Sequence, residues 1–275
     1  MLSYTEVDVF ARGPLSGNPV AVVHGADGLD DATMQAFARW TNLSETTFLL
    51  PPTDPAADYR VRIFTPGREL PFAGHPTLGT AHAWLEAGGA PREAGVVAQE
   101  CGVGLVTVRR EDVLSFAAPG FLRHGEVDDA TLDQALASVG VGRDRLVAAA
   151  WIDNGPGWLG LQLASADDVL AIVPDSTVMA DLHLGVLGPH GDGGPADVEV
   201  RAFAGGIGVD EDPVTGSLNA GFAVWLIGTG ALPPSYVARQ GTAIGRDGRV
   251  VVEQVGDDVW IGGATRTVVS GSVAL

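Results

Sequence analysis

Lysine is absent from this sequence, and all 16 basic residues are arginine. A lysine amine forms the Schiff base of pyridoxal phosphate enzymes and contacts the nucleotide phosphates in P-loop NTPases and protein kinases. The chain therefore belongs to none of these three classes of enzyme.

Cysteine and clustered metal ligands are scarce as well. Cys101 is the only cysteine, which excludes an intramolecular disulfide, a cysteine-rich zinc site and an acid/base pair of two thiols. We expect its thiol to be buried and structural. The six histidines show no His-x-x-x-His spacing and no clustered carboxylates beside them, so we expect no metal site.

Long apolar runs are also missing. No stretch of the sequence is long enough to span a bilayer. Residues 1–10 include acidic side chains and lack the cationic region and apolar run of a signal peptide. The sequence therefore predicts a cytoplasmic protein.

Positive charge is in short supply, because 34 acidic residues leave a formal net charge of -18. The long-range field of such a protein repels nucleic acid and anionic lipid surfaces, so we expect neither as a partner. A small anionic metabolite would need a locally positive site, such as a helix N-terminus, to bind against this field. Solubility alone also explains the net charge.

The second half of the chain repeats the pattern of the first. Residues 61–64 (Val-Arg-Ile-Phe) match residues 200–203 (Val-Arg-Ala-Phe), and residues 83–85 (Ala-Trp-Leu) match residues 224–226 (Val-Trp-Leu). In both halves a loop rich in glycine and proline lies between the matched segments and leads into an apolar stretch. This self-similarity indicates two copies of one structural unit.

Each copy has the pattern of several strands and one buried helix. Alternating side chains predict half-buried strands over residues 59–63 and 198–202. Residues 77–86 and 218–227 predict helices that are apolar nearly all round, and such helices must be buried. We therefore expect an α+β fold of two similar domains related by a pseudo-twofold axis, each a mixed, barrel-like β-sheet wrapped around a central α-helix.

The domain boundaries follow from where the strand pattern is interrupted. We expect residues 1–118 and the C-terminal segment 264–275 to form the first domain, and residues 119–263 to form the second. The C-terminal segment is rich in β-forming residues, and we expect it to return and pair with the first domain.

Two matched loops precede the buried helices, at residues 71–76 (Pro-Phe-Ala-Gly-His-Pro) and 211–217 (Glu-Asp-Pro-Val-Thr-Gly-Ser). Pro76 suits the first helical position, which would make His75 the N-cap, with residues 216–217 in the matching place. A duplication brings such loops face to face. We therefore expect an active-site cleft between the domains, where two helix N-termini bind a carboxylate or a developing oxyanion.

A simpler explanation of these loop residues stays open. His75, Asp212 and Ser217 also suit ordinary cap and turn positions, where a polar side chain can hydrogen-bond to nearby backbone groups.

Glu45 lies in a third segment of interest, residues 42–48 (Asn-Leu-Ser-Glu-Thr-Thr-Phe). The pattern predicts a helix over residues 31–40, capped by Asp30 or Asp31, and a strand over residues 46–50. Glu45 would stand between them among apolar neighbours, where desolvation can raise its pKa toward neutrality and let it take and return protons. A solvated glutamate in a turn is the alternative.

Together these segments resemble the PhzF-like family, within the diaminopimelate epimerase fold superfamily. The segments that carry the resemblance occur in the family's order: residues 8–10, 17–22, 42–46, 64–66, 69–76 and 211–217. The set is specific although each piece alone is not.

The resemblance implies a homodimer with an active site between two domains, using no cofactor and no metal. It assigns Glu45 as the acid/base, with His75, Asp212 and Ser217 lining the same site. It also places the backbone of Gly74 in that site. We therefore expect Asn18, Gly74, Pro76 and Gly216 to bind the substrate. Related epimerases have two cysteines in these loops, and their absence here excludes racemisation by two thiols.

The implied activity is isomerisation of a small cyclic amino or hydroxy acid by proton transfer, similar to that of trans-2,3-dihydro-3-hydroxyanthranilate isomerase. Phenazine synthesis itself does not follow, because residues 151–158 and 205–209, which would shape the substrate site, carry no diagnostic pattern. Two alternatives remain. One is a non-catalytic binding protein, and the other is a hydrolase using Ser217, which lacks a G-x-S-x-G elbow.

Overall fold

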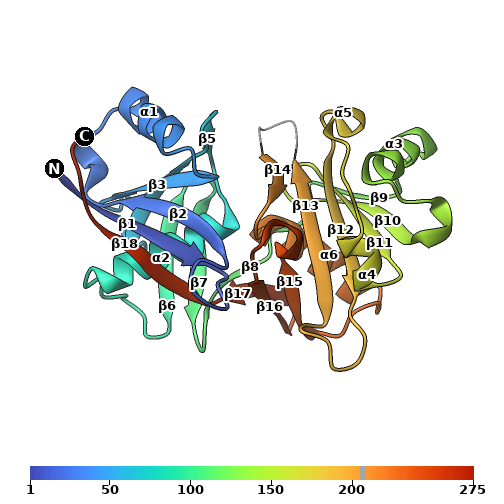
Figure 1. Ribbon diagram of the computed structural model, residues 1–275. Coiled ribbons are helices and arrows are strands. Elements are labelled where there is room, and N and C mark those ends of the chain that lie inside the picture. Colours follow the sequence, from blue (N-terminus) through green and yellow to red (C-terminus); the bar gives the residue numbers. More distant parts are fainter. Residues whose placement is uncertain (205–208) are drawn as a thin grey trace. The chain divides into compact units, whose positions relative to one another are not determined.

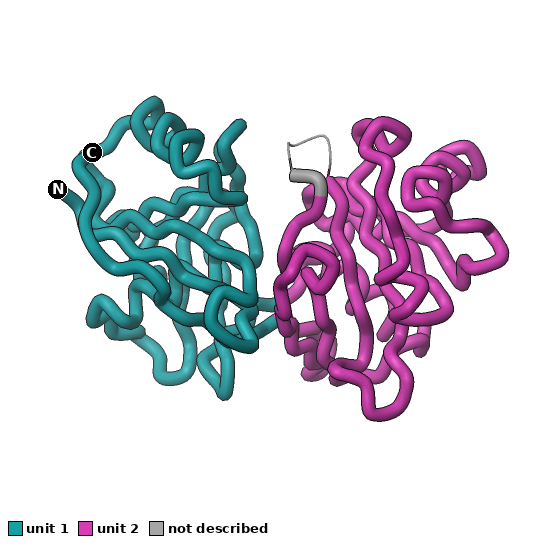
Figure 2. Tube along the Cα trace, viewed as in Figure 1, with its two compact units in different colours: residues 1–117, 262–275 teal, residues 118–261 magenta. Residues whose placement is uncertain are grey.

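The computed structural model describes residues 1–204 and 209–275. Two compact units make up the chain, one of Met1–Ala117 with Gly262–Leu275 and the other of Ala118–Ile261 (Figure 2). We call them unit 1 and unit 2. Within the described residues, no helix is both long enough and apolar enough to cross a membrane.

Unit 1 is a mixed sheet around one helix (Figure 1). Its elements are β1 (Leu2–Val9), β2 (Asn18–Val23), η1 (Ala26–Gly28), α1 (Asp31–Thr41), β3 (Glu45–Leu50), β4 (Tyr59–Phe64), β5 (Glu69–Leu70), α2 (Gly74–Glu86), β6 (Val96–Cys101), β7 (Gly104–Arg110), β8 (Leu114–Ala117) and β18 (Thr265–Val273). Strand β2 runs parallel to β3 and β4 runs parallel to β6, while the other pairs are antiparallel.

Helix α2 is the centre of unit 1. It contacts β1, β2, β3, β6, β7, β8 and β18, and most of its residues are buried. Gly79 allows the close approach, since a Cβ there would lie 2.2 Å from Cγ1 of Val20 on β2. The expectation of an apolar helix wrapped by its own sheet is confirmed for this unit.

Unit 2 has the same plan. Its elements are β9 (Arg123–Gly125), α3 (Asp129–Val139), η2 (Arg143–Arg145), β10 (Leu146–Asp153), β11 (Trp158–Leu163), α4 (Ala166–Leu170), α5 (Ser176–Met179), β12 (His183–Pro189), β13 (Val198–Ala204), β14 (Val209–Asp212), α6 (Gly216–Gly228), β15 (Ser235–Gln240), η4 (Thr242–Ile244), β16 (Gly248–Val255) and most of β17 (Asp258–Gly263).

The pairing pattern of the two units matches strand for strand. The run β10 to β16 pairs antiparallel, parallel, antiparallel, antiparallel, parallel and antiparallel, as β1 to β7 do. Helix α6 contacts β10, β11 and β16, in the place of α2. The mixed α+β architecture predicted from the sequence repeat is confirmed.

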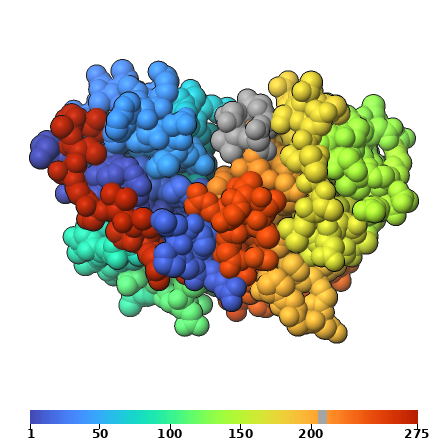
Figure 3. All heavy atoms as spheres, in the orientation of Figure 1, coloured from blue at the N-terminus to red at the C-terminus, as the bar shows by residue number. Residues whose placement is uncertain are grey.

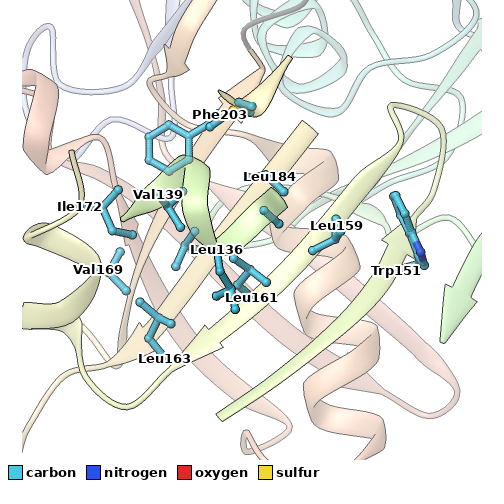
Figure 4. Close-up of a cluster of buried hydrophobic side chains, with 13 residues drawn as sticks. Leu136, Val139, Trp151, Leu159, Leu161, Leu163, Val169, Ile172, Leu184 and Phe203 are labelled. Atoms are coloured by element: carbon cyan, nitrogen blue, oxygen red, sulfur yellow. The ribbon is translucent and has the colours of Figure 1, made fainter. Parts of the chain in front are cut away.

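Each unit has a second apolar layer on the outer side of its sheet. In unit 1, Met34 and Phe37 of α1 pack in one cluster with Phe48 and Phe64 of the sheet. In unit 2, Leu136 and Val139 of α3 belong to a larger cluster (Figure 4). The outer helices thus bury the face of each sheet that the central helix leaves uncovered.

The C-terminal segment forms the outer strand of unit 1. Strand β18 pairs antiparallel with β1 along its length, from Leu2 opposite Val273 to Val9 opposite Thr265. Figure 3 shows it in dark red on the surface of that unit. The C-terminal segment thus pairs with the first strand of the chain.

Three local predictions need correction or refinement. Helix α2 begins at Gly74, two residues before Pro76, and its N-cap is Ala73 rather than His75. Proline is tolerated there because every N–H of the first turn lacks a helical partner. Glu45 is the first residue of β3 rather than a residue before it. Cys101, at the end of β6, is half-buried rather than buried, and partial burial raises the pKa of its thiol.

Candidate active site

Glu45 is placed by the end of one helix and the start of a strand. Helix α1 begins after Asp30, whose side chain accepts from the Thr33 N–H, and ends at Asn42 in the left-handed conformation, with φ 56. The chain then enters β3, where Glu45 lies opposite Val20 of β2. Its side chain is 15% exposed, so the alternative of a solvated turn glutamate does not describe it.

His75 lies against Glu45. The distance from His75 Nε2 to Glu45 Oε2 is 3.4 Å, and the His75 side chain is 6% exposed. The ring hydrogen-bonds to the backbone of Pro19, which offers only a carbonyl. Nε2 makes no hydrogen bond in the described part of the chain, so the donor is Nδ1–H. This bond fixes the tautomer and leaves the Nε2 lone pair facing Glu45.

Burial sets the charge of this histidine. Loss of hydration lowers the pKa of His75 to about 3, with the Pro19 hydrogen bond opposing the shift. The imidazole is therefore neutral near pH 7. A neutral ring next to a carboxyl group can accept a hydrogen bond from the protonated acid but does not hold the carboxylate as a fixed ion pair.

The turn before Asn18 and Pro19, the first two residues of β2, is held by Asp8, whose role is not predicted from the sequence. Asp8, almost fully buried, accepts hydrogen bonds from the N–H groups of Ser16 (3.0 Å) and Gly17 (2.9 Å). Gly17 has no room for a side chain, because a Cβ would lie 2.1 Å from the Val9 carbonyl oxygen. Asp8 thereby positions Pro19 under His75, and Asn18 is fully buried beside it.

Gly74 and Pro76 complete the first turn of α2, and both are buried. A Cβ at Gly74 would lie 2.4 Å from Cζ of Phe116 on β8. Glycine is therefore required by packing at this position, as well as suiting the close approach of a ligand to the backbone.

In unit 2, Asp212, Gly216 and Ser217 lie close together around the start of α6. Asp212 is the last residue of β14, and Oδ2 accepts a hydrogen bond of 2.5 Å from the Thr215 hydroxyl. Thr215 is the N-cap, and Gly216 is the first, buried residue of the helix.

Ser217 is held by the segment that follows β10. Trp158 Nε1 donates to Ser217 Oγ over 3.0 Å, and Asn154 Nδ2 donates to the Ser217 carbonyl over 2.8 Å. A serine nucleophile needs a neighbouring base to accept its proton, and an indole N–H is a donor only. The geometry therefore favours a binding role for Ser217 over the hydrolase alternative. Residues 205–208, part of the other segment expected to shape the substrate site, lie outside the described residues.

The structure thus forms two local sets from the predicted residues, Glu45 with His75 and Asn18 in unit 1, and Asp212 with Gly216 and Ser217 in unit 2. In the part of the chain that is described, no three His, Cys, Asp or Glu side chains are grouped closely enough to hold a metal ion. The two sets offer a carboxyl group beside a buried imidazole, a hydrogen-bonded carboxylate and a serine hydroxyl at a helix N-terminus.

Solved structures define the class of fold. The crystal structure of a phenazine biosynthesis protein of the PhzF family from Enterococcus faecalis superimposes with a TM-score of 0.83, at 26% identity, covering 100% of both chains. Two sheet-wrapped helices in one chain are therefore the epimerase-like fold expected from the resemblance.

Sequence comparison then gives the family. The phenazine biosynthesis-like protein family matches residues 7–271. Antisense-enhancing sequence 1 of Schizosaccharomyces pombe is 38% identical, covering 98% of this chain and 97% of its own. Trans-2,3-dihydro-3-hydroxyanthranilate isomerase of Pseudomonas fluorescens is 35% identical, covering 90% of this chain and 88% of its own. The chain belongs to the phenazine biosynthesis-like family, and it is an isomerase.

Proposed function

We propose that this isomerase moves a proton within a small cyclic amino or hydroxy acid and that Glu45 carries the proton. The observation behind the proposal is the largely buried pair in unit 1, in which Glu45 Oε2 lies 3.4 Å from Nε2 of His75. A carboxyl group in such a site can remove a proton from one carbon and return a proton to another, and exchange of the carboxyl proton with solvent lets deuterium enter the product.

The proposed reaction conserves atoms and electrons. The Glu45 carboxylate removes a proton from a carbon next to an unsaturated system, and the electron pair of the broken C–H bond moves into that system. The protonated carboxyl group faces the lone pair of His75 Nε2, which can accept a hydrogen bond from it. Glu45 then returns the proton to another carbon of the conjugated system, which forms a new C–H bond and leaves an isomer.

The remaining predicted residues would bind and orient the substrate. Asp212 and His75 suit an amino or hydroxyl group, and Ser217 supplies a hydroxyl that is already held by Trp158. The main-chain N–H groups at Gly74 and Gly216 begin helices and suit a substrate carboxylate. The relative from Pseudomonas fluorescens supports trans-2,3-dihydro-3-hydroxyanthranilate as the first substrate to test. A homodimer, implied by the family resemblance, is part of the proposal and can be checked by sedimentation.

Glu45→Gln tests the proposal, because it keeps the shape of the side chain and removes the base. Proton exchange is followed by NMR in deuterated buffer with trans-2,3-dihydro-3-hydroxyanthranilate and a panel of related cyclic amino and hydroxy acids. We expect the wild type to incorporate deuterium and the variant to lose at least about 100-fold in rate, as for removal of a general acid/base. Glu111→Gln, at an exposed turn, is the matched control and should behave as wild type. Near-normal exchange in Glu45→Gln would refute the assignment, and binding without exchange across the panel would favour a non-catalytic binding protein.

A further inference from the structure

Gln240, at the end of β15, is fully buried and lies at the centre of a hydrogen-bond network beside Asp212. Its Nε2 donates to the Asp212 carbonyl (3.0 Å) and to the Thr215 hydroxyl (2.8 Å). Its Oε1 accepts from the Thr215 N–H (3.0 Å) and from Asn219 Nδ2 (2.9 Å). Asn219 Nδ2 also donates to the Thr215 carbonyl over 2.9 Å.

The backbone decides the direction of every bond in this network. The Thr215 N–H can only donate and the Asp212 carbonyl can only accept, so the amide of Gln240 has one possible orientation. Its NH2 group therefore donates to the Thr215 hydroxyl. The oxygen of that hydroxyl is occupied as an acceptor, and its own proton is directed at Asp212 Oδ2, 2.5 Å away.

Because of the position of Thr215 at the start of α6, this arrangement deprives the helix of a capping hydrogen bond. Thr215 is the N-cap of α6, a position where a threonine hydroxyl usually accepts from an N–H of the first turn and stabilises the helix by about 1 kcal/mol. Here its side chain makes no capping hydrogen bond. The hydroxyl is used on the carboxylate of Asp212 instead.

We propose that Thr215 and Gln240 are positioning residues, which fix the side-chain direction of Asp212 through a relay from Gln240 to Thr215 to the carboxylate. The inference rests on the proposed function, because it gives Asp212 a role toward the substrate. Neither residue was singled out from the sequence, since Gln240 follows Thr215 by 25 residues and nothing in the pattern connects them.

The experiment compares four variants with the wild type. Thr215→Val keeps the shape and removes the hydroxyl, Thr215→Ser keeps the hydroxyl, and Asp212→Asn tests the role of the carboxylate itself. Thr80→Val is the matched control, since Thr80 is fully buried in α2 and its hydroxyl donates only to Thr47 Oγ1, over 2.9 Å. Crystal structures and turnover of trans-2,3-dihydro-3-hydroxyanthranilate are measured for each.

We expect the Asp212 carboxylate to leave its position in crystals of Thr215→Val and to keep it in Thr215→Ser. kcat/KM should fall by roughly 10- to 100-fold in Thr215→Val, the range typical of a misplaced group, with most of it restored in Thr215→Ser and no loss in Thr80→Val. A loss in Thr215→Val that Thr215→Ser does not restore would mean a packing effect and overturn the proposal.

The two hypotheses fail in different ways. Full activity in Asp212→Asn would overturn the proposed role of Asp212. A large loss in Asp212→Asn together with wild-type kinetics and an unmoved carboxylate in Thr215→Val would overturn the positioning relay alone. If the wild type does not turn over this substrate, the substrate assignment fails, and the crystal structures alone then decide the relay.

Discussion

At the scale of single residues, His75 is neutral near pH 7, and this neutral state makes the stability of the protein depend on pH. The pKa of about 3 in the folded protein is far below the ordinary histidine value of 6.5. The unfolded chain therefore takes up a proton at this residue before the folded one does. The stability that results is complete above about pH 6.5 and is lost as the pH falls from there toward 3.

We expect the free energy of unfolding to fall by about 2 kcal/mol between pH 7 and pH 5 because of His75 alone, since each unit of difference in pKa is worth about 1.4 kcal/mol. His75→Asn, whose amide can still donate to the Pro19 carbonyl, should remove this part of the pH dependence. Urea denaturation of both proteins at several pH values measures it. The comparison is repeated with Glu45→Gln as the background of both proteins, so that titration of the neighbouring carboxylate does not contribute to the pH dependence. Equal slopes with and without His75 would show that the ring is not held neutral.

The sequence predicted which residue types matter but not what holds them. Glu45 and His75 were proposed from loops and a family resemblance, and the structure brings the two within 3.4 Å. The supporting contacts were not predictable, because Asp8, Pro19 and Gln240 act through hydrogen bonds to residues distant in sequence. His75 was expected to cap α2 on the strength of Pro76, a signal that fixes a helix start only to within one turn.

At the scale of elements, an arginine and a glutamate join the short strand β5 to β4 in unit 1 and the short strand β14 to β13 in unit 2. In unit 1, Arg62 on β4 binds both oxygens of Glu69 on β5. In unit 2, Arg201 on β13 binds both oxygens of Glu211 on β14, over 3.0 and 2.7 Å. The pairs occupy matched places in the repeat but differ in exposure, at 21% and 42% for the first pair and 4% and 7% for the second.

This difference predicts unequal costs for the same substitution. Arg201→Met leaves the buried Glu211 without its partner, together with the Val169 and Ile172 carbonyls to which Arg201 donates. We expect it to destabilise the protein by about 3–5 kcal/mol, the usual cost of breaking a buried pair. Arg62→Met should cost less than about 1 kcal/mol, because its pair is screened by water. Denaturation in urea, followed by tryptophan fluorescence, gives both values, and similar losses would contradict the role assigned to burial.

The repeat explains why elements were easier to predict than their exact ends. Matching Val61-Arg62 to Val200-Arg201 identified β4 and β13, and the apolar stretches that follow identified α2 and α6. The sequence predicts the starts of these two helices too late, because glycine, here Gly74 and Gly216, usually indicates a loop. In the structure both are buried within the first turn of a helix, where the packing of Phe116 on Gly74 overrides the weak helix propensity of glycine.

At the scale of the whole molecule, the chain topology exchanges a strand between its two halves. Strand β9 follows the hairpin that ends with β8, yet it pairs with β10 of unit 2. Strand β18 follows β17 in the same way and pairs with β1 of unit 1. Each unit therefore takes its outer strand from the end of the other copy of the repeat, which explains why the C-terminal segment belongs to unit 1.

The charge of the whole molecule bears on how an anionic substrate arrives. A net charge of -18 repels an anion over a distance set by the Debye length, which falls from about 30 Å at 0.01 M salt to about 10 Å at 0.1 M. The attraction of a helix N-terminus for an anion acts only over short range. Screening should therefore weaken the repulsion more than the attraction.

We expect kcat/KM for an anionic substrate to rise severalfold between about 10 mM and about 300 mM sodium chloride, because salt removes the long-range repulsion first. For a hydroxy acid without an amino group, the neutral ester, assayed alongside the anion, should show little dependence on salt. Initial rates at substrate concentrations below KM measure the effect in both cases. A fall in kcat/KM with salt for the anion would mean instead that a locally positive region governs its approach.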